Sequence, residues 1–491
     1  MNHPATHDRT HEEDPEKTFT KMKLRHLSAL VWCTGCIMWL TVTLAFLAGC
    51  AHPETQPALL NPATVETALQ PPSLASIRIS AAKLAHPILQ PLRIDGRDGF
   101  SPDEIAVMTV IVSQQLRALR DQRGVAQAQV LQAGILPNPQ LGYSIDQPHG
   151  DNFPGLINGQ NLGLSWDFTA LLGRQDRINS AQSSAGALDL SIAWQEWQAA
   201  QDARQRAFRL LAMRARLPLL REIETDLADA LAANRQAASL GHKTVGDVTL
   251  ASEALIAAQT ARLTAEQDYI AERAALNVAL GQPADTEIAL KPAATFPELP
   301  PDTSAATLLQ GLEQRRLDLV ALTLGYESQE ANLRAAVKAQ FPKIGLSVAK
   351  ANDTSDVRTR TYGVTIDLPL FDRNQGNVAS ARATRQQLFD EYVARVAEAR
   401  ADVIVLLGKL AAVRTQLQAD TAALPDLEHL VASLAKALES RNADVTAYRD
   451  ARGSLAAHRL EQGNLQQQTI ELAVALELAT GRPLLNRNST R

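Results

Sequence analysis

Very few side chains in this sequence have the types and spacing that enzyme chemistry requires. The chain contains no G-x-S-x-G nucleophile motif, no H-E-x-x-H pair and no cluster of Cys and His with zinc-ligand spacing. Gly241-His-Lys-Thr244 is similar to the end of a phosphate-binding loop, but the upstream glycine spacing is missing and no strand precedes it. We therefore predict a protein that is not an enzyme and has neither a cofactor nor a dedicated metal site.

The side chains that could act on a passing solute are three aspartates in segments of alternating polarity. Asp146, Asp167 and Asp367 each lie near the end of such a segment, on the side that carries small and polar residues. Carboxylates on the wall of a pore favour cations. The simpler interpretation is that they form local hydrogen bonds or keep that face of the strand hydrated. We predict Asp167 and Asp367 as the stronger pore-lining candidates and Asp146 as the weaker one.

A cysteine that follows an apolar segment is the second chemical feature. A basic stretch at 21–25 precedes an apolar run from Leu27 to Leu47, and Leu47-Ala-Gly-Cys50 ends it. This string resembles the lipobox of bacterial lipoproteins, which are cleaved before the Cys and acylated on its thiol. We predict a lipoprotein signal peptide at 1–49 and lipidation of Cys50.

Two alternatives to this interpretation stay open. About 20 apolar residues are long enough to span a bilayer, so the run could be a retained transmembrane helix. Met22 is an alternative start of the chain. Cys33 and Cys36 lie inside the apolar run, so Cys50 is the one cysteine left after cleavage and no intrachain disulfide is expected.

Composition favours long helices and argues against a nucleic-acid partner. The chain has 491 residues, of which 45% are hydrophobic and only 4% aromatic. A core with so few aromatic residues must be built largely from Ala and Leu, as in coiled coils. The formal net charge of −5 gives no electrostatic attraction to nucleic acid.

The chain repeats itself over a long period. Gly163-Leu-Ser-Trp-Asp167 reappears as Gly363-Val-Thr-Ile-Asp367, and the Gly-x-Pro at Gly281 reappears at Gly481. Each copy has the pattern of two strands followed by a long helical hairpin, and such an elongated unit predicts assembly with other copies. We predict a tether at 50–100, a first repeat at 101–282, a connector at 283–304, a second repeat at 305–484 and a short tail at 485–491.

Four segments alternate strictly between apolar and small or polar residues, which is typical of β-strands. They lie at about 140–147, 159–168, 343–350 and 361–369. A soluble sandwich would turn the apolar face inward, and a transmembrane barrel would turn it outward to lipid. Four strands cannot close a barrel, because the smallest closed barrels have about eight. If these strands span a membrane, several chains must share one barrel.

Helical patterns fill most of the remaining chain. Ser101-Pro102-Asp-Glu104 has the signals of a helix start, and we predict one helix from Pro102 to Ala133. Helical hairpins are predicted at about 174–280 and 375–480, with ascending helices roughly 100 Å long at 1.5 Å per residue. Pro218 and Pro425 lie inside these ascending helices and are expected to bend or interrupt them.

The two hairpin ends carry small and acidic residues. The residues concerned are Gly241, Gly246, Asp247, Asn442 and Asp444. The simpler interpretation of the acidic pair is helix capping, since the pattern that ends in Asp247 matches a capping box. The alternative is a docking surface or an aperture.

From about 95 to 484 the chain resembles the TolC-type outer membrane efflux protein family. The resemblance rests on Leu136-Pro-Asn-Pro139, on Leu368-Pro-Leu-Phe-Asp-Arg-Asn-Gln-Gly376 and on the helix ends at Gly281 and Gly481. The longer string is similar to the CzcC-like branch, which is associated with heavy-metal efflux. The resemblance implies that both hairpin ends dock the adaptor protein, and Arg441 at the second end stands where the family usually has Gly.

The resemblance implies an α+β membrane protein that forms a homotrimer. Each chain would contribute four strands to a twelve-stranded transmembrane β-barrel and its hairpins to a long periplasmic α-helical barrel. The implied function is a passive efflux conduit in the outer membrane, lipid-anchored at Cys50 and extending into the periplasm. Its implied partners are a periplasmic adaptor protein, an inner-membrane pump and the outer membrane lipid.

Two further possibilities remain for the function. We favour metal cations as substrates, with drugs or other organic compounds as the alternative. A coiled-coil lipoprotein scaffold or pump adaptor would also contain long hairpins. Four amphipathic strands in two repeated pairs argue against that alternative.

Overall fold

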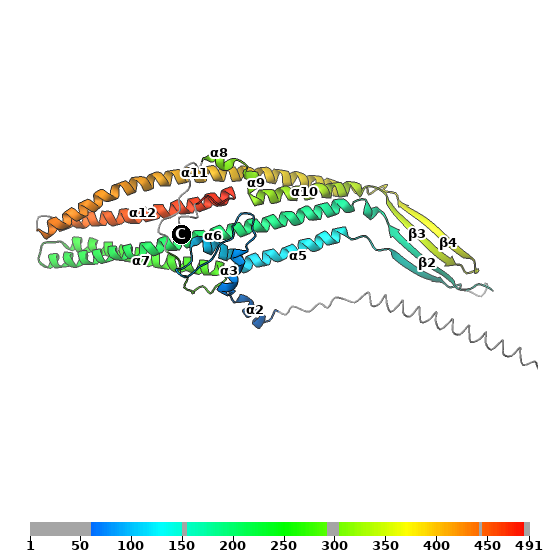
Figure 1. Cartoon of the computed structure of the whole chain (residues 1–491), viewed down its shortest axis with the longest axis horizontal. Helices are drawn as coiled ribbons and strands as arrows, with labels where there is room; N and C mark the ends of the chain where they lie inside the picture. Colours follow the sequence, from blue (N-terminus) through cyan, green and yellow to red (C-terminus); the bar gives the residue numbers. More distant parts are fainter. Residues whose placement is uncertain (1–59, 150–154, 292–303, 441–443, 486–491) are drawn as a thin grey trace, which may run out of the picture. The chain divides into compact units, whose positions relative to one another are not determined.

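The computed structural model describes residues 60–149, 155–291, 304–440 and 444–485 (Figure 1). The chain divides into two compact units, Met1–Ala68 and Leu69–Arg491. Of the first unit, residues 60–68 are described, and most of them belong to helix α2 (Pro62–Leu69). The predicted signal peptide and Cys50 lie outside the described residues. Helices α3 to α12 and all four strands belong to the second unit.

Helices α4 (Pro102–Val112) and α5 (Gln114–Gly134) replace the single helix that the sequence predicts, so that prediction is wrong. Ser101 and Glu104 form a capping box at the start of α4, with each side chain accepting a hydrogen bond from the other residue's backbone N–H. The chain leaves the helical conformation at Ser113, whose hydroxyl oxygen accepts from the Leu116 N–H and caps α5. Serine side chains compete in this way with helical hydrogen bonds.

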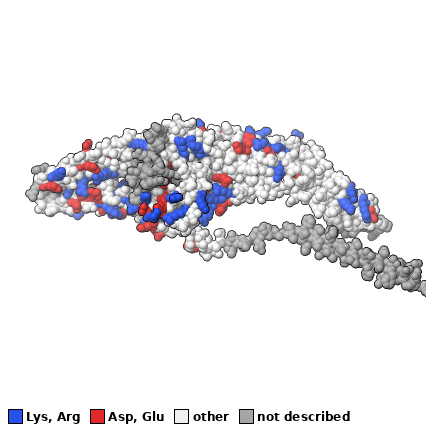
Figure 2. All heavy atoms as spheres, in the orientation of Figure 1, with Lys and Arg blue, Asp and Glu red and all other residues white. Residues whose placement is uncertain are grey.

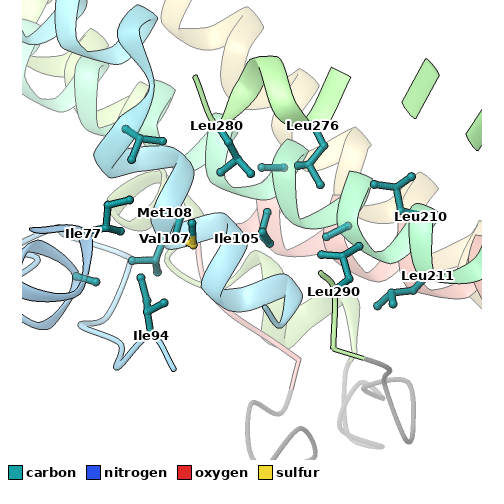
Figure 3. Close-up of a cluster of buried hydrophobic side chains, with 14 residues drawn as sticks. Ile77, Ile94, Ile105, Val107, Met108, Leu210, Leu211, Leu276, Leu280 and Leu290 are labelled. Carbon is teal, nitrogen blue, oxygen red and sulfur yellow. The ribbon is translucent and has the colours of Figure 1, made fainter. Parts of the chain in front are cut away.

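The prediction of an extended tether is wrong for residues 74–100. This segment contains helix α3 (Leu74–Ala82), and it packs into the interior rather than leading away from it. Ile77, Ala81 and Ile94 are buried in one cluster with residues of α4, α6 and α7. Figure 3 shows Ile77 and Ile94 beside Val107 and Met108 of α4. Burial of these few apolar side chains outweighs the Pro-rich composition that suggested a tether.

The four strands form one antiparallel sheet in the order β1-β2-β3-β4. Their bounds are β1 (Gln140–Asp146), β2 (Gly159–Asp167), β3 (Lys343–Asn352) and β4 (Arg358–Asp367). The pairing of β2 with β3 joins the two repeats, with Ser165 opposite Ser347. A short 3-10 helix, η1 (Thr169–Leu171), follows β2.

Each strand pair continues into a long helical hairpin. The first is α6 (Arg174–Ser239) with α7 (Val245–Ala279), and the second is α11 (Gln375–Glu439) with α12 (Val445–Thr480). Helices α8 (Ala305–Leu309), α9 (Leu312–Arg315) and α10 (Leu317–Lys338) precede β3. The prediction of an α+β fold built from a duplicated unit is confirmed.

Both helix-interior prolines lie within unbroken helices. Pro218 is inside α6 and Pro425 is inside α11. Of the two predicted outcomes, a bend or an interruption, the interruption does not occur. A proline removes one hydrogen bond, and packing against neighbouring helices can offset that loss.

Helix α6 is the element around which the others pack. It contacts α4, α5, α7, α10 and α12. Ala200, Ala203 and Ala207 are fully buried on α6, and Trp197 is buried beside them. Small side chains let several neighbouring helices approach one helix closely, which suits a core with few aromatic residues. In Figure 1 the sheet extends from one end of these helices, and the hairpin turns lie at the other end.

None of the helices in the described ranges combines the length and the hydrophobicity needed to cross a membrane.

A buried carboxylate connects four parts of this assembly. Glu477 of α12 is completely buried, and it pairs with Arg204 of α6, which also contacts Asp103 of α4 at 2.8 Å. The second carboxylate oxygen of Glu477 accepts from the backbone N–H groups of Leu484 and Leu485, each at 2.6 Å. Several donors therefore offset the cost of burying this charge.

We predict that Glu477→Ala lowers the free energy of unfolding by about 3 kcal/mol, because Arg204 would lose its fully buried partner. Denaturant titration of the detergent-solubilised protein, followed by helical circular dichroism, measures the change. The control is Glu428→Ala, which removes a solvent-exposed pair with Arg459 and should cost less than about 1 kcal/mol. Equal losses in the two variants would contradict the assignment.

Two glycines that end the returning helices offer a second test. Gly281 and Gly481 are left-handed, with φ of 62° and 65°. A Cβ at 481 would lie 3.1 Å from the Arg315 carbonyl oxygen, whereas at 281 its nearest neighbour, the Val112 carbonyl oxygen, is 3.5 Å away. We expect Gly281→Ala to cost about 1–2 kcal/mol through backbone strain, and Gly481→Ala to cost more. The same denaturant titration measures the loss of unfolding free energy in each variant. A larger loss in Gly281→Ala than in Gly481→Ala would refute the prediction.

Candidate functional site

The sheet presents two chemically different faces, and the described residues place no helix over either one. One face carries small and polar residues such as Gly163, Ser165 and Ser347. The other face is apolar, and its side chains are exposed, with Leu141 71% and Tyr362 76% accessible. A soluble sandwich would bury this face, so that alternative does not fit the chain as it stands.

The strand register determines which of the candidate aspartates lie near one another. Asp167 lies opposite Gly345, and Asp367 lies opposite Lys343, so both are on the small-polar face at the end of the sheet nearest the helices. Asp146 lies opposite Gly159, on the same face but at the far end. The structure therefore places Asp167 and Asp367 at the same end of the sheet, two residues apart in register, and leaves Asp146 at the other end.

The surroundings of the two neighbouring aspartates differ. The Asp167 carboxylate accepts a hydrogen bond from the Thr169 N–H at 2.8 Å, which matches the simpler, local interpretation. Asp367 faces Lys343 across the strand pair, where directly opposite Cβ atoms are about 5 Å apart. Sequence reasoning missed Lys343, although its alternation with Gly345 and Ser347 places it on this face. The ammonium group offsets part of the negative charge at this level.

Helix capping accounts for the local contacts of the hairpin-end aspartates. Asp247 accepts from the Thr244 N–H at 2.8 Å, and the Thr244 hydroxyl accepts from the Asp247 N–H at 3.2 Å. The backbone hydrogen bond from Thr244 holds the pKa of Asp247 below its usual range. Asp444 caps α12 by accepting from the Thr446 N–H at 3.0 Å.

The glycines at the first hairpin end have different roles. Gly241 is left-handed, with φ of 75°, and ends α6, whereas Gly246 lies in the first turn of α7. Asn442, and the neighbouring Arg441, lie outside the described residues.

A link between the two hairpins was not predicted from the sequence. Arg452 of α12 contacts Asp226 at 2.8 Å and Glu222 at 3.0 Å, both on α6. The link borders a groove that Leu227 and Tyr448 also line. Burial, the largest influence, raises the pKa of Asp226 above its usual range. Sequence alone shows only scattered charges on two separate helices.

Within the described parts of the chain, no group of three or more His, Cys, Asp or Glu side chains could hold a metal ion.

Comparison with known proteins identifies a family signature in the second half of the chain. Residues 308–482 match the model of the outer membrane efflux protein family. The chain is 24% identical over 367 residues to the cobalt-zinc-cadmium resistance protein CzcC of Cupriavidus metallidurans, a match that covers 72% of this chain and 83% of CzcC.

Solved structures share the fold of this chain. The channel protein CusC matches with a TM-score of 0.63 at 19% identity, over 82% of this chain and 98% of CusC. VceC of Vibrio cholerae matches with a TM-score of 0.61 at 18% identity, over 78% and 96% of the two chains. The open-state channel MtrE of Neisseria gonorrhoeae matches with a TM-score of 0.63 at 17% identity, over 84% and 94%.

The family whose model matches residues 308–482 consists of outer membrane efflux channel proteins, which are transport conduits rather than enzymes. The sequence-based recognition of this family is confirmed. Pore lining by the aspartates and docking at the hairpin ends stay predictions.

We predict that the double variant Asp167→Asn with Asp367→Asn lowers the cation-to-anion permeability ratio of the channel by about twofold, because wall carboxylates attract cations. Reversal potentials in planar bilayers under a KCl gradient measure the ratio. The matched control is Asp356→Asn in the β3–β4 turn, which should leave the ratio unchanged. An unchanged ratio in the double variant would leave these aspartates with capping and hydration roles only.

We also predict that Arg452→Gln loosens the attachment of α12 to α6 near the hairpin ends. Amide hydrogen exchange over 445–456 should quicken by about fivefold, since partly exposed ion pairs contribute about 1 kcal/mol. Mass spectrometry of exchanged peptides measures the rate. Arg459→Gln removes one exposed pair with Glu428 on α11 and should leave exchange over 445–456 near the wild-type rate. The link has no structural role if both variants match wild type.

Proposed function

We propose that this protein is a passive trimeric conduit that carries substrates from an inner-membrane pump and a periplasmic adaptor to the cell exterior. The observation that supports the proposal most directly is the exposed apolar face of the sheet. Strands of about 9–11 residues span a membrane when tilted, and β3 and β4 have 10 residues each. Lipid would then cover the apolar face, and the small-polar face would line the lumen.

The open edges of the sheet support assembly of several copies. β1 and β4 lie at the two edges of the four-stranded sheet. An unpaired strand edge cannot lie in lipid, and a barrel needs about eight strands to close. Three copies, each pairing its β1 with the β4 of a neighbour, would close a twelve-stranded barrel.

Exposed apolar stripes on the long helices support the same assembly. On α7, Ile256, Leu263 and Ile270 recur every seven residues and are exposed. On α11, Phe389 and Val393 are also exposed, one turn apart. A seven-residue apolar repeat is typical of a helix that packs against another helix. A second copy of the chain would supply the missing partner helices.

The membrane anchor and the partners follow from the sequence predictions. We propose that Cys50 is acylated and holds the chain at the outer membrane, with the hairpins in the periplasm. The hairpin ends, with Gly241, Gly246 and Asp247 at the first and Asn442 and Asp444 at the second, would meet the adaptor. The pump would supply the energy, since this sequence has no complete nucleotide-binding motif.

Metal cations are the substrates that we favour. The name of the related protein CzcC refers to cobalt, zinc and cadmium resistance. Carboxylates at Asp167 and Asp367 would favour cations over anions in a lumen. A conduit for drugs or other organic compounds is the alternative that a growth experiment has to exclude.

The assembly can be tested on the purified protein. We expect a trimer by mass photometry in detergent, and stepwise conductance when the protein is added to a planar bilayer. A monomer without conductance would refute the conduit.

The substrate class can be tested by growth of a deletion strain on graded Co, Zn, Cd, Ni, Cu and Ag, with drugs and dyes in parallel. We expect sensitivity to a subset of the metals that the intact gene restores. Sensitivity to organic compounds alone would overturn the metal assignment and keep the conduit.

A further inference from the structure

The apolar face of the sheet ends in two basic side chains that lie directly opposite each other. Lys350 of β3 pairs in register with Arg360 of β4. Along the same face they follow Val348 and Tyr362, which also lie opposite each other. Both basic residues are exposed. A face that would otherwise contact hydrocarbon thus carries an adjacent pair of positive charges at one end.

Two like charges directly opposite each other destabilise a sheet, because their Cβ atoms are only about 5 Å apart. Among the described residues, neither Lys350 nor Arg360 forms an ion pair. The acids of the adjacent turn are engaged locally. Asp356 accepts from the Asn352 side chain at 3.0 Å, and Asp353 accepts from two backbone N–H groups of the turn. The pair therefore lacks a compensating anion within the described chain.

Beside the two cations the face is hollowed. A shallow groove runs over β1, β2, β3 and β4, and Lys350 and Arg360 line it together with the apolar side chains of Leu141, Leu162, Leu164, Val348 and Tyr362. The groove thus combines an apolar floor with a cationic border. A ligand that fits both parts needs an alkyl chain and an anionic group.

The position along the strands indicates where such a ligand would lie. Lys350 and Arg360 stand two residues before Asn352 and two residues after Arg358, the ends of β3 and β4 at the turn. Arg358 lies diagonal to Lys350 on the same face and adds a third positive charge. Figure 2 shows Lys and Arg atoms on the sheet toward its end away from the helices. This end would reach the membrane boundary opposite the helical hairpins.

We propose that Lys350 and Arg360, supported by Arg358, bind the phosphate of an anionic membrane lipid whose acyl chain lies in the groove. The inference rests on the proposed function, because it requires the apolar face to contact lipid. A guanidinium binds phosphate through two parallel hydrogen bonds, and an ammonium adds a compact charge. Cationic side chains near a membrane surface attract anionic lipids, and long basic side chains extend from apolar surface toward the headgroups.

Retention of a phosphorylated lipid by the purified full-length protein tests the proposal. The protein is incubated with diphosphoryl lipid A in detergent micelles and washed by detergent exchange, and retained lipid is quantified by mass spectrometry. We expect Lys350→Gln with Arg360→Gln to retain about tenfold less lipid than wild type, because two headgroup contacts are lost. The control, Arg382→Gln with Lys409→Gln, removes the same charge from α11 and should retain the wild-type amount.

Two further measurements, phosphate competition and conductance, distinguish failure of the lipid site from failure of the proposed conduit. Excess inorganic phosphate should not displace the lipid, because it lacks an acyl chain, and full displacement would overturn the lipid assignment in favour of a simple anion site. Equal retention by both double variants and wild type would also overturn it. Conductance is measured on the same samples, so absent conductance in every sample refutes the conduit, whereas normal conductance with equal retention refutes only the lipid site.

Discussion

The structure depends on one constraint, which is that the apolar face of the four-stranded sheet has no cover within the described chain. Leu141 and Tyr362 are mostly exposed, and β1 and β4 remain unpaired at the sheet edges. Exposed apolar area and free strand edges are both unfavourable in water. Both costs are removed where lipid covers the apolar face of the sheet and other copies of the chain pair with its edges.

The helices satisfy a different requirement, since they form their own interior without large side chains. Buried alanines on α6 let five helices approach it closely, and Glu477 connects α12 to Arg204 and to the residues after the helix. Such an interior holds the sheet at one end and the hairpin turns at the other (Figure 1). The chain thus has the architecture of a conduit wall, in which the position of charges matters more than any reactive group.

Charges on the two faces of the sheet have different environments. On the small-polar face, Asp367 lies opposite Lys343. The carboxylate there attracts cations, and the neighbouring ammonium group offsets part of its negative charge. On the apolar face, Lys350 and Arg360 have no acidic partner in the described chain and border an apolar groove. The first arrangement suits solutes in water, and the second suits the headgroup of a lipid.

The sequence by itself determined the elements whose signals are local. Alternation with period two predicted the strands, and the patterns at Ser101 and Thr244 predicted capped helix starts, because a strand face or a cap involves residues only a few positions apart. The break at Ser113, the packing of Ile77 and Ile94, and the opposition of Lys350 and Arg360 were decided by the tertiary structure. These features depend on strand register and on packing between distant segments, and no short stretch of sequence carries that information.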